Sequence, residues 1–306
     1  MTLYKTSSLN IFKTWLLMSL FLVLIIAFGF VMSAYYGNIN IIYGAIIFSL
    51  ALNFFSYFFS DKIALSINGA NEIKSRSIHT ELWNVVENLS ITAGLPMPRL
   101  YIIDDPIPNA FATGRNENNS AVAVTNGLLL ILNKSELEGV IAHELSHIKN
   151  KDILIQTIVV VLVGAIAMIS ELFLRFNIFN NDGQKKNPIL FIFVLVAMIL
   201  VPIAASIIRL AISRKREFLA DSSGALLTRY PEGLANALQK ISQYNQPLKH
   251  AHAATAHMYI VNPLGLAGDK NDKDEKVSWF SKLFMTHPDV SERVRALLGE
   301  TMAEKK

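Results

Sequence analysis

Residues 140–161 read VIAHELSHIKNKDILIQTIVVV and place two unlike features side by side. The first is a pair of histidines, His143 and His147, with Glu144 next to the first of them. The second is an apolar segment that begins at Ile153, six residues after His147. A helix with polar, reactive side chains therefore runs toward a segment apolar enough to enter a bilayer. This junction predicts polar chemistry close to a membrane surface.

The composition favours a membrane protein. Of the 306 residues, 52% are hydrophobic and 17% are charged, and the mean hydropathy is +0.37. These values are too apolar for an ordinary soluble protein. The chain has no cysteine, which excludes a disulfide framework and a cysteine-based zinc site. Any metal ligands must therefore be histidine, aspartate or glutamate.

The chain is basic, with a net charge of +4 and a pI of about 9.1. Its basic residues cluster beside apolar segments, where contacts with lipid headgroups account for them. We therefore expect the lipid bilayer as a partner and do not expect nucleic acid. Nothing in the sequence predicts an oligomeric state.

Four apolar segments are long enough to cross a bilayer. Between Lys13 and Asp61 there is no Asp, Glu, Lys or Arg over 47 residues, which is roughly 70 Å of helix and about twice a ~30 Å hydrocarbon core. Residues 35–40, with Gly37 among them, interrupt this run near its middle. We therefore predict four transmembrane helices, at about residues 14–34, 40–60, 153–170 and 187–208.

Four spans place both long polar segments on one side of the membrane. Lys and Arg residues near the span ends are more numerous on that side, which predicts that it faces the cytoplasm. The residues on that side are Lys5, Lys13, Lys62, Lys149, Lys151, Arg209, Arg214, Lys215 and Arg216, against Arg175, Lys185 and Lys186 on the other. The predicted organisation is a first membrane hairpin (1–61), the first part of a polar domain (62–152), a second hairpin (153–212) and the second part of that domain (213–306).

The polar domain is predicted to be mainly helical with a small sheet. Apolar residues at helical spacing predict a helix from Thr80 that ends near Gly94. Residues 99–104 and 120–125 have the pattern of short strands, and turn-rich sequences lie between them. Ser135 and Glu138 fit a capping box at the start of the helix with the histidines. We therefore expect an integral membrane, mainly α protein whose polar domain is of the α+β class.

The two histidines predict a metal site. A spacing of four residues stacks His143 and His147 on one face of a helix. Two such nitrogens can bind one Zn²⁺, while Glu144 faces a water that completes the coordination. Zinc would make this water acidic and polarise a scissile carbonyl, and Glu144 would act as the general base.

A catalytic site of this kind needs a third protein ligand, and Glu217 is the best candidate. Glu217 and Asp221 are four residues apart and share a helix face, so that one could ligate the metal while the other orients a histidine. Glu217 follows the fourth predicted span by about 13 Å of helix, and His147 precedes the third by about 9 Å. Both side chains are thus expected in one layer next to the membrane. A solvated pair of charges is the alternative for these two residues.

These motifs resemble the HtpX family of membrane-bound zinc metalloproteases, which are relatives of the CAAX prenyl proteases. The resemblance covers nearly the whole chain and includes the four-span layout. Its segments are Pro108–Gly114, Ala121–Gly127, Glu138–Asn150, the downstream Glu217–Asp221 and Thr286–Arg293. It implies a gluzincin-like catalytic domain in which His143, His147 and Glu217 bind one zinc ion, Glu144 is the base and Asp221 supports a ligand.

Further roles are implied mainly by the same resemblance. His287 and Arg293 would stabilise the negative charge that develops on the carbonyl oxygen during hydrolysis. Two extended segments would offer backbone groups to a substrate peptide, although a plain core hairpin is the alternative. Their residues are Asn109, Ala110, Phe111, Ala121, Val122 and Ala123. Three other histidines, His250, His252 and His257, are expected in a solvent-facing loop.

The sequence therefore predicts a zinc endopeptidase of the cytoplasmic, or inner, membrane that crosses the bilayer several times. By resemblance, its substrates would be misfolded or damaged membrane proteins and unfolded polypeptides, in a stress-linked quality-control role. A dedicated processing protease for one peptide or lipidated partner is an alternative. A second alternative is a zinc-containing scaffold or chaperone that cleaves nothing. An intramembrane protease is disfavoured because charged residues flank the motif on both sides.

Overall fold

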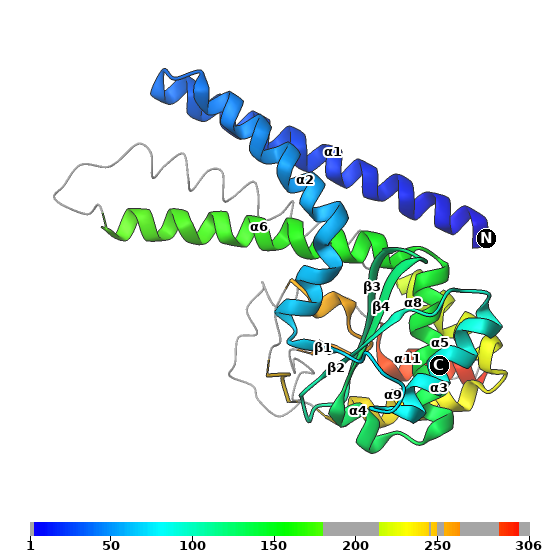
Figure 1. The fold of residues 1–306 in the computed structure, drawn as a ribbon. Coiled ribbons are helices and arrows are strands. Elements are labelled where there is room, and N and C mark those ends of the chain that lie inside the picture. Colours follow the sequence, from blue (N-terminus) through cyan, green and yellow to red (C-terminus); the bar gives the residue numbers. More distant parts are fainter. Residues whose placement is uncertain (1–2, 180–213, 245, 250–253, 264–287, 300–306) are drawn as a thin grey trace, which may run out of the picture.

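The computed structural model describes residues 3–179, 214–244, 246–249, 254–263 and 288–299. Three long helices extend to one side of a rounded domain that holds the sheet and the shorter helices (Figure 1). They are α1 (Leu3–Tyr36), α2 (Asn40–Ile67) and α6 (Asp152–Phe179). The fold is mainly helical with one small sheet, in agreement with the prediction.

Helices α1 and α2 form a hairpin, and both are long and apolar enough to cross a membrane. The candidate spans are Ser8–Ala34 and Asn40–Ile67, and the predicted spans 14–34 and 40–60 lie within them. Helix α1 has 34 residues, or about 51 Å of helix, so it is longer than a ~30 Å hydrocarbon core. Its first turns can therefore lie beside the domain while the remainder lies in lipid.

The surface of α2 is inverted relative to a helix of a soluble protein. Its exposed side carries large apolar residues, among them Ile47, Leu50, Phe54 and Phe55. Its buried side carries the polar residues Ser49, Asn53, Ser56 and Ser60. Only 17% of the apolar window of α2 is buried within the protein. An apolar exterior and small polar residues at helix contacts are expected where lipid surrounds a helix, so this arrangement favours a membrane span over a core helix.

Helix α6 contains the third predicted span, residues 153–170. Its Ile158 and Leu162 pack in one cluster with Met18 and Phe21 of α1, which places α6 alongside the hairpin. Among the described residues, the apolar part of α6 is Asp152–Ile166. The fourth predicted span, 187–208, lies outside the described residues.

The sheet has four strands in the order β1-β2-β4-β3. They are β1 (Ala70–Glu72), β2 (Arg99–Ile103), β3 (Ala110–Asn116) and β4 (Asn119–Thr125). Strand β4 pairs in parallel with β2 and antiparallel with β3. The predicted strands 99–104 and 120–125 correspond to β2 and β4. Strand β3 was not predicted because its first five residues are all buried, which removes the alternation of polar and apolar residues.

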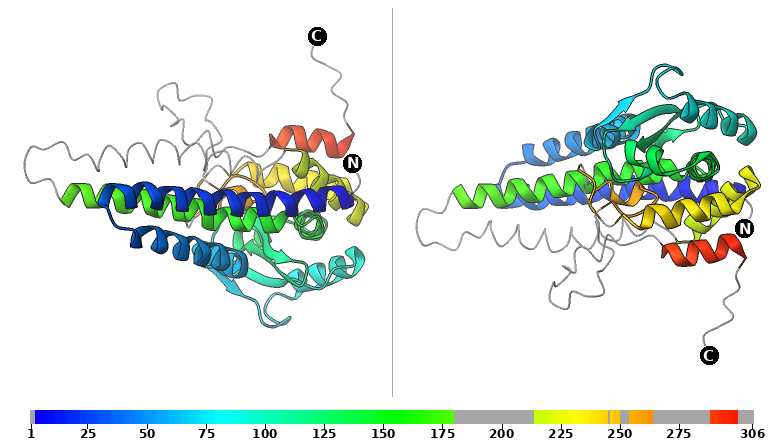
Figure 2. Two further views of the ribbon diagram at one scale, coloured as in Figure 1. Left: turned by 90° about the horizontal axis from the view of Figure 1, so that it is seen from above. Right: turned by 90° about the horizontal axis from the view of Figure 1, so that it is seen from below.

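Both faces of the sheet are covered by helices. On one face, Val122 and Val124 of β4 pack with Leu137, Val140 and other residues of the helical domain. On the other face, Ala121 and Ala123 pack with residues of α1, α2 and α6, because successive side chains of a strand point to opposite faces. Figure 2 shows this sheet next to the domain ends of the long helices. The sheet thus connects the membrane helices to the domain.

Helices α3 (Thr80–Ala93), α8 (Arg214–Thr228) and α9 (Pro231–Ser242) pack against α5 (Lys134–Lys149), the helix that carries the two histidines. The remaining helices described are α4 (Asn126–Ile131), the short η1 (Ala256–Met258) and α11 (Val290–Leu298). Helix α3 starts at Thr80 and ends before Gly94, as predicted. The predicted capping box at Ser135 and Glu138 is wrong: the box joins Asn133 and Glu136, because α5 begins one residue after Asn133.

Candidate metal centre and active site

His143 and His147 lie on one face of α5, and their reactive nitrogens meet. The two Nε2 atoms are 3.1 Å apart. The helix begins with a complete capping box, in which Asn133 accepts from the Glu136 amide and the Glu136 side chain accepts from the Asn133 amide, which satisfies two otherwise free amides of the first turn. The spacing of four residues on this well-anchored helix therefore fixes both imidazoles side by side, as predicted.

Glu217 reaches the same point from α8. Its carboxylate oxygens are each 3.8 Å from a histidine Nε2 atom, Oε2 from His143 and Oε1 from His147. The close approach of α8 to α5 depends on Gly224, where a Cβ atom would lie 3.0 Å from the backbone nitrogen of His143. A larger residue at this position would push α8, and Glu217 with it, away from the histidines.

This trio fits a divalent cation. Ligand atoms of His143, His147 and Glu217 all lie within 4.8 Å of one another, and all three residues are buried. Burial alone would lower the pKa of His147, but the hydrogen bond to Asp152 and the charge of Glu217 raise it to about 9. The surroundings thus favour positive charge at this point. Two imidazoles and a carboxylate are the donor set of catalytic zinc sites.

Asp221 and Arg293 support His143 from behind. The Oδ1 atom of Asp221 lies 2.9 Å from Nδ1 of His143. Arg293 donates to both carboxylate oxygens of Asp221, at 2.9 and 2.7 Å, and to the carbonyl of Ile260 at 2.9 Å. Burial raises the pKa of Asp221, but Arg293 and His143 outweigh it and hold the pKa below its usual value. An ionised Asp221 keeps the His143 Nε2 atom directed at the other ligands.

These contacts bear on the role expected for Arg293. We expected it to stabilise negative charge on a substrate. Three of its five N–H groups are engaged by Asp221 and Ile260, and the residue is 1% exposed. Such a bidentate pair fixes the position of the guanidinium. The guanidinium also faces the candidate metal ligands, with Nη1 4.0 Å from Oε2 of Glu217 and Nη2 3.4 Å from Nε2 of His143. The geometry shows that Arg293 positions Asp221, while its role toward the substrate stays a prediction.

The sequence did not predict the role of Asp152, which orients the second histidine. Its Oδ2 atom lies 3.0 Å from Nδ1 of His147, and its Oδ1 atom accepts from Asn10 of α1 at 2.6 Å. The chain turns at Lys151, whose φ is 58°, and this turn brings Asp152 onto the histidine. An acidic residue in the first turn after the metal-binding helix was the available signal. The contact with Asn10 links a membrane helix to the metal centre.

Replacing Asp152 with asparagine should weaken metal binding by about 10–100-fold, because the charged partner of His147 is lost. Chelator competition on detergent-purified protein would measure the affinity. Asp104→Asn is the matched control, since Asp104 is exposed and contacts only Asn126 among the described residues. Equal affinities in the two variants would show that Asp152 has no influence on the metal.

Glu144 is buried beside the three candidate metal ligands. Burial raises its pKa from 4.5 to about 7, and the charge of His147 and a backbone hydrogen bond from Ala112 partly counteract this effect. A nearby divalent cation would favour the ionised carboxylate further. A carboxyl group with a pKa near neutrality can both accept and return a proton, which is the requirement for a general acid and base.

The comparison with known proteins agrees with this geometry. Residues 76–301 match Peptidase family M48. A "Protease HtpX homolog" of Dictyoglomus turgidum is 46% identical over 304 residues, which cover 98% of this chain and 96% of that protein. The chain belongs to the HtpX proteases of peptidase family M48. The resemblance inferred from the sequence is thereby confirmed, and the chain is a membrane-anchored metallopeptidase.

Two more HtpX proteins match nearly the whole chain, and one solved structure shares its fold. "Protease HtpX homolog" proteins of Tropheryma whipplei (strain Twist) and Caldanaerobacter subterraneus are 44% and 41% identical and cover 96% and 98% of this chain, and 97% and 99% of their own lengths. The crystal structure of S. mikatae Ste24p is similar with a TM-score of 0.51 and 18% identity, covering 96% of this chain and 67% of that one. The M48 fold is therefore shared with Ste24p.

The predicted substrate strands of this M48 peptidase need a correction. Strand β4, with Ala121, Val122 and Ala123, is paired on both sides and cannot receive another strand. Strand β3 is at one edge of the sheet and is next to Glu144, to which Ala112 hydrogen-bonds. Of the two predicted segments, only the one in β3 therefore has an edge along which a peptide could add.

Part of the β3 edge is already occupied. The Ala110 carbonyl accepts from the Ile260 amide at 3.0 Å. Asn109 uses its side chain to contact Val261, and Phe111 is fully buried against Tyr259. The three residues predicted to bind substrate in this segment therefore bind the chain itself, and the segment 259–261 takes the place of a neighbouring strand at that end of β3.

The other predicted histidines have different outcomes. His287, expected beside the substrate carbonyl, lies outside the described residues, as do His250 and His252. His257 was expected to face solvent, but it is 2% exposed and its Nε2 atom contacts the Gln156 carbonyl at 3.0 Å. The prediction failed because η1 folds against α6 rather than forming an open loop.

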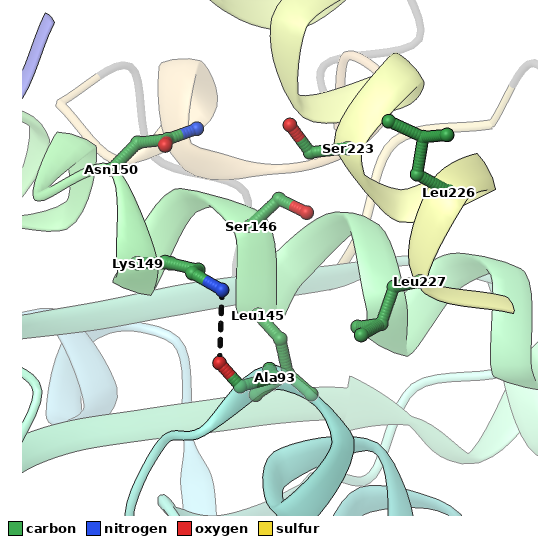
Figure 3. A pocket seen from close by; sticks show the side chains of 8 residues that line it. All are labelled: Ala93, Leu145, Ser146, Lys149, Asn150, Ser223, Leu226 and Leu227. Atoms are coloured by element: carbon green, nitrogen blue, oxygen red, sulfur yellow. Dashed lines mark hydrogen bonds between the residues drawn. The ribbon is translucent and has the colours of Figure 1, made fainter. Parts of the chain in front are cut away.

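A separate cavity of about 260 Å³ lies on the outer side of the seam between α5 and α8 (Figure 3). Its lining includes Leu145, Ser146 and Ser223 but none of the three metal ligands. Lys149 crosses it and donates to the Ala93 carbonyl at 2.9 Å. Ala93 is at the C-terminal end of α3, where the helix dipole favours a cation. The cavity is therefore distinct from the peptidase site.

Proposed function

We propose that this chain is a zinc-dependent endopeptidase that hydrolyses misfolded or damaged membrane proteins. The observation that carries the proposal is the buried group of His143, His147 and Glu217 with Glu144 beside it. Two histidines and one carboxylate leave an open coordination position in a zinc site, as catalysis requires. Glu144 disfavours a purely structural metal, because such a site needs no general base.

The chain's own residues divide the work of hydrolysis. His143, His147 and Glu217 would hold the ion, and a bound zinc ion would activate water and polarise the scissile carbonyl. Glu144 takes a proton from the attacking water and delivers it to the leaving amine. Asp221 and Asp152 keep the two imidazoles in place from opposite sides. Strand β3 provides the edge along which an extended substrate lies.

We place the protein in the cytoplasmic, or inner, membrane with four spans and the catalytic domain facing the cytoplasm. The concentration of Lys and Arg at span ends on the side of the domain supports this orientation. The metal centre is tied to α1 through Asn10 and Asp152, so substrates would reach it as they leave the bilayer. Membrane proteins and unfolded chains at the membrane are the partners that this location favours.

The experiment is cleavage of casein by detergent-purified protein, combined with measurement of its zinc content. We expect one zinc ion per chain, loss of cleavage after chelation and recovery when zinc is restored. A quality-control protease should cut casein at many sites. Cleavage at one site would favour a dedicated processing enzyme, and bound zinc without any cleavage would favour a scaffold.

A further inference from the structure

A cavity of about 490 Å³ lies between the domain end of α2 and the turn that joins β3 to β4. It is remote from the metal ligands in sequence and shares no lining residue with them. The residues that determine its chemistry are Phe54, Phe58, Phe59, Lys62, Arg99 and Arg115. Three aromatic rings and three cations thus line one hollow.

The charges of the cavity favour an anion. Arg99 is paired with Asp61, whose Oδ2 atom is 2.6 Å from Nη2 of the arginine. Lys62 and Arg115 form no ion pair with the described residues; each lies over a ring instead, at 5.5 Å from the Phe59 centroid and 5.0 Å from that of Phe58. With one carboxylate against three cations, the cavity carries an excess positive charge.

The position of the cavity along α2 matches a membrane interface. The apolar part of α2 runs from residue 40 to residue 60, about 30 Å of helix, which is the thickness of a hydrocarbon core. Phe54 and Phe58 therefore lie in the last turns within the core, and both are exposed, by 55% and 40%. Lys62 follows at the level of the lipid headgroups, where Lys and Arg are favoured.

We propose that this cavity binds one anionic phospholipid. The phosphate would lie between Lys62 and Arg115, where the guanidinium can donate two hydrogen bonds to phosphate oxygens. The acyl chains would run along Phe54 and Phe58 into the bilayer. A soluble phosphate compound would satisfy the cations but would leave the exposed surfaces of these rings uncovered, so the occupant is a lipid. The excess positive charge selects anionic headgroups over zwitterionic ones.

The test uses the full chain in nanodiscs that contain phosphatidylcholine and 20% phosphatidylglycerol. After mild detergent extraction, native mass spectrometry counts the lipids retained per chain. We expect one phosphatidylglycerol on the wild type and at least a 5-fold lower occupancy in Arg115→Gln. Lys62→Gln is the second variant, because Lys62 is exposed and its replacement is compatible with folding. Addition of glycerol 1-phosphate should not displace the lipid.

Arg295→Gln is the matched control. It makes the same change of charge at an exposed position of α11, which Figure 2 shows on the opposite side of the domain from α2. This variant should retain the lipid like the wild type. Equal loss in Arg115→Gln and Arg295→Gln, equal retention of phosphatidylcholine, or displacement by glycerol 1-phosphate would each overturn the proposal.

Discussion

Glu144→Gln should lower the turnover of a cleavable substrate by about 10²–10⁴-fold, the contribution of a well-placed general base. Glutamine has nearly the same shape and keeps an acceptor oxygen, but it cannot take up a proton at neutral pH. The three candidate metal ligands are unchanged, so the variant should still bind one metal ion per chain. Casein cleavage and metal content, measured on the same preparation, would separate these two effects.

Glu138→Gln is the control for this variant. It introduces the same chemical change on the same helix, at a partly exposed residue that pairs with Lys134 across 4.0 Å. Surface pairs of this kind contribute little to stability, so its turnover should equal that of the wild type. Full cleavage by Glu144→Gln would show that another group is the base, while loss of its metal would make Glu144 a structural support.

The core of the metal centre could be predicted because it depends on local geometry. The i, i+4 spacing alone placed His143 and His147 on one helix face. Glu217 was found by a distance argument, because helices that leave the membrane bring side chains of similar depth into one layer. The position of Glu217 beside the histidines also depends on Gly224, which packs against α5. No pattern in the sequence predicts this packing.

The support of His143 by Asp221 was predicted, but the contacts of Asp152, Asn10 and Arg293 were not, because they depend on a turn of unusual geometry or join residues that are distant in the chain. Asp152 meets His147 through a turn at Lys151 with a positive φ, a conformation that lysine rarely adopts. Asn10 joins them from 142 residues away. In the sequence, Arg293 looks like a charged residue on the surface of a helix. Only the tertiary fold places its side chain against Asp221. Strand β3 was not predicted because helices cover both of its faces, so that its sequence lacks the alternation of polar and apolar residues.

The environment of α2 was predictable from composition, but the arrangement of its faces was not. A long apolar run predicts a span whichever side faces lipid. In the structure, Phe54 and Phe58 face outward and Ser56 and Asn53 face the neighbouring helices, because small polar side chains allow close contact between helices. The same orientation exposes the aromatic part of the proposed lipid cavity.

Arg293→Met should lower the free energy of unfolding by about 3–5 kcal/mol, because it leaves Asp221 ionised and buried without its partner. Methionine fills similar space with an apolar chain, so the effect reports the charge rather than a cavity. Metal affinity should fall as well, since Asp221 is then no longer fixed against His143. Denaturant unfolding in detergent and chelator competition would measure the two quantities.

The double variant Arg293→Met with Asp221→Asn tests this explanation. Removing the buried charge should recover most of the lost stability, although not the metal affinity, because His143 still lacks an anionic partner. Arg295→Met, at an exposed position of the same helix, should change stability by no more than about 0.5 kcal/mol. If Arg293→Met instead keeps its stability and its metal but loses turnover, Arg293 acts on the substrate, and the contact with Asp221 is secondary.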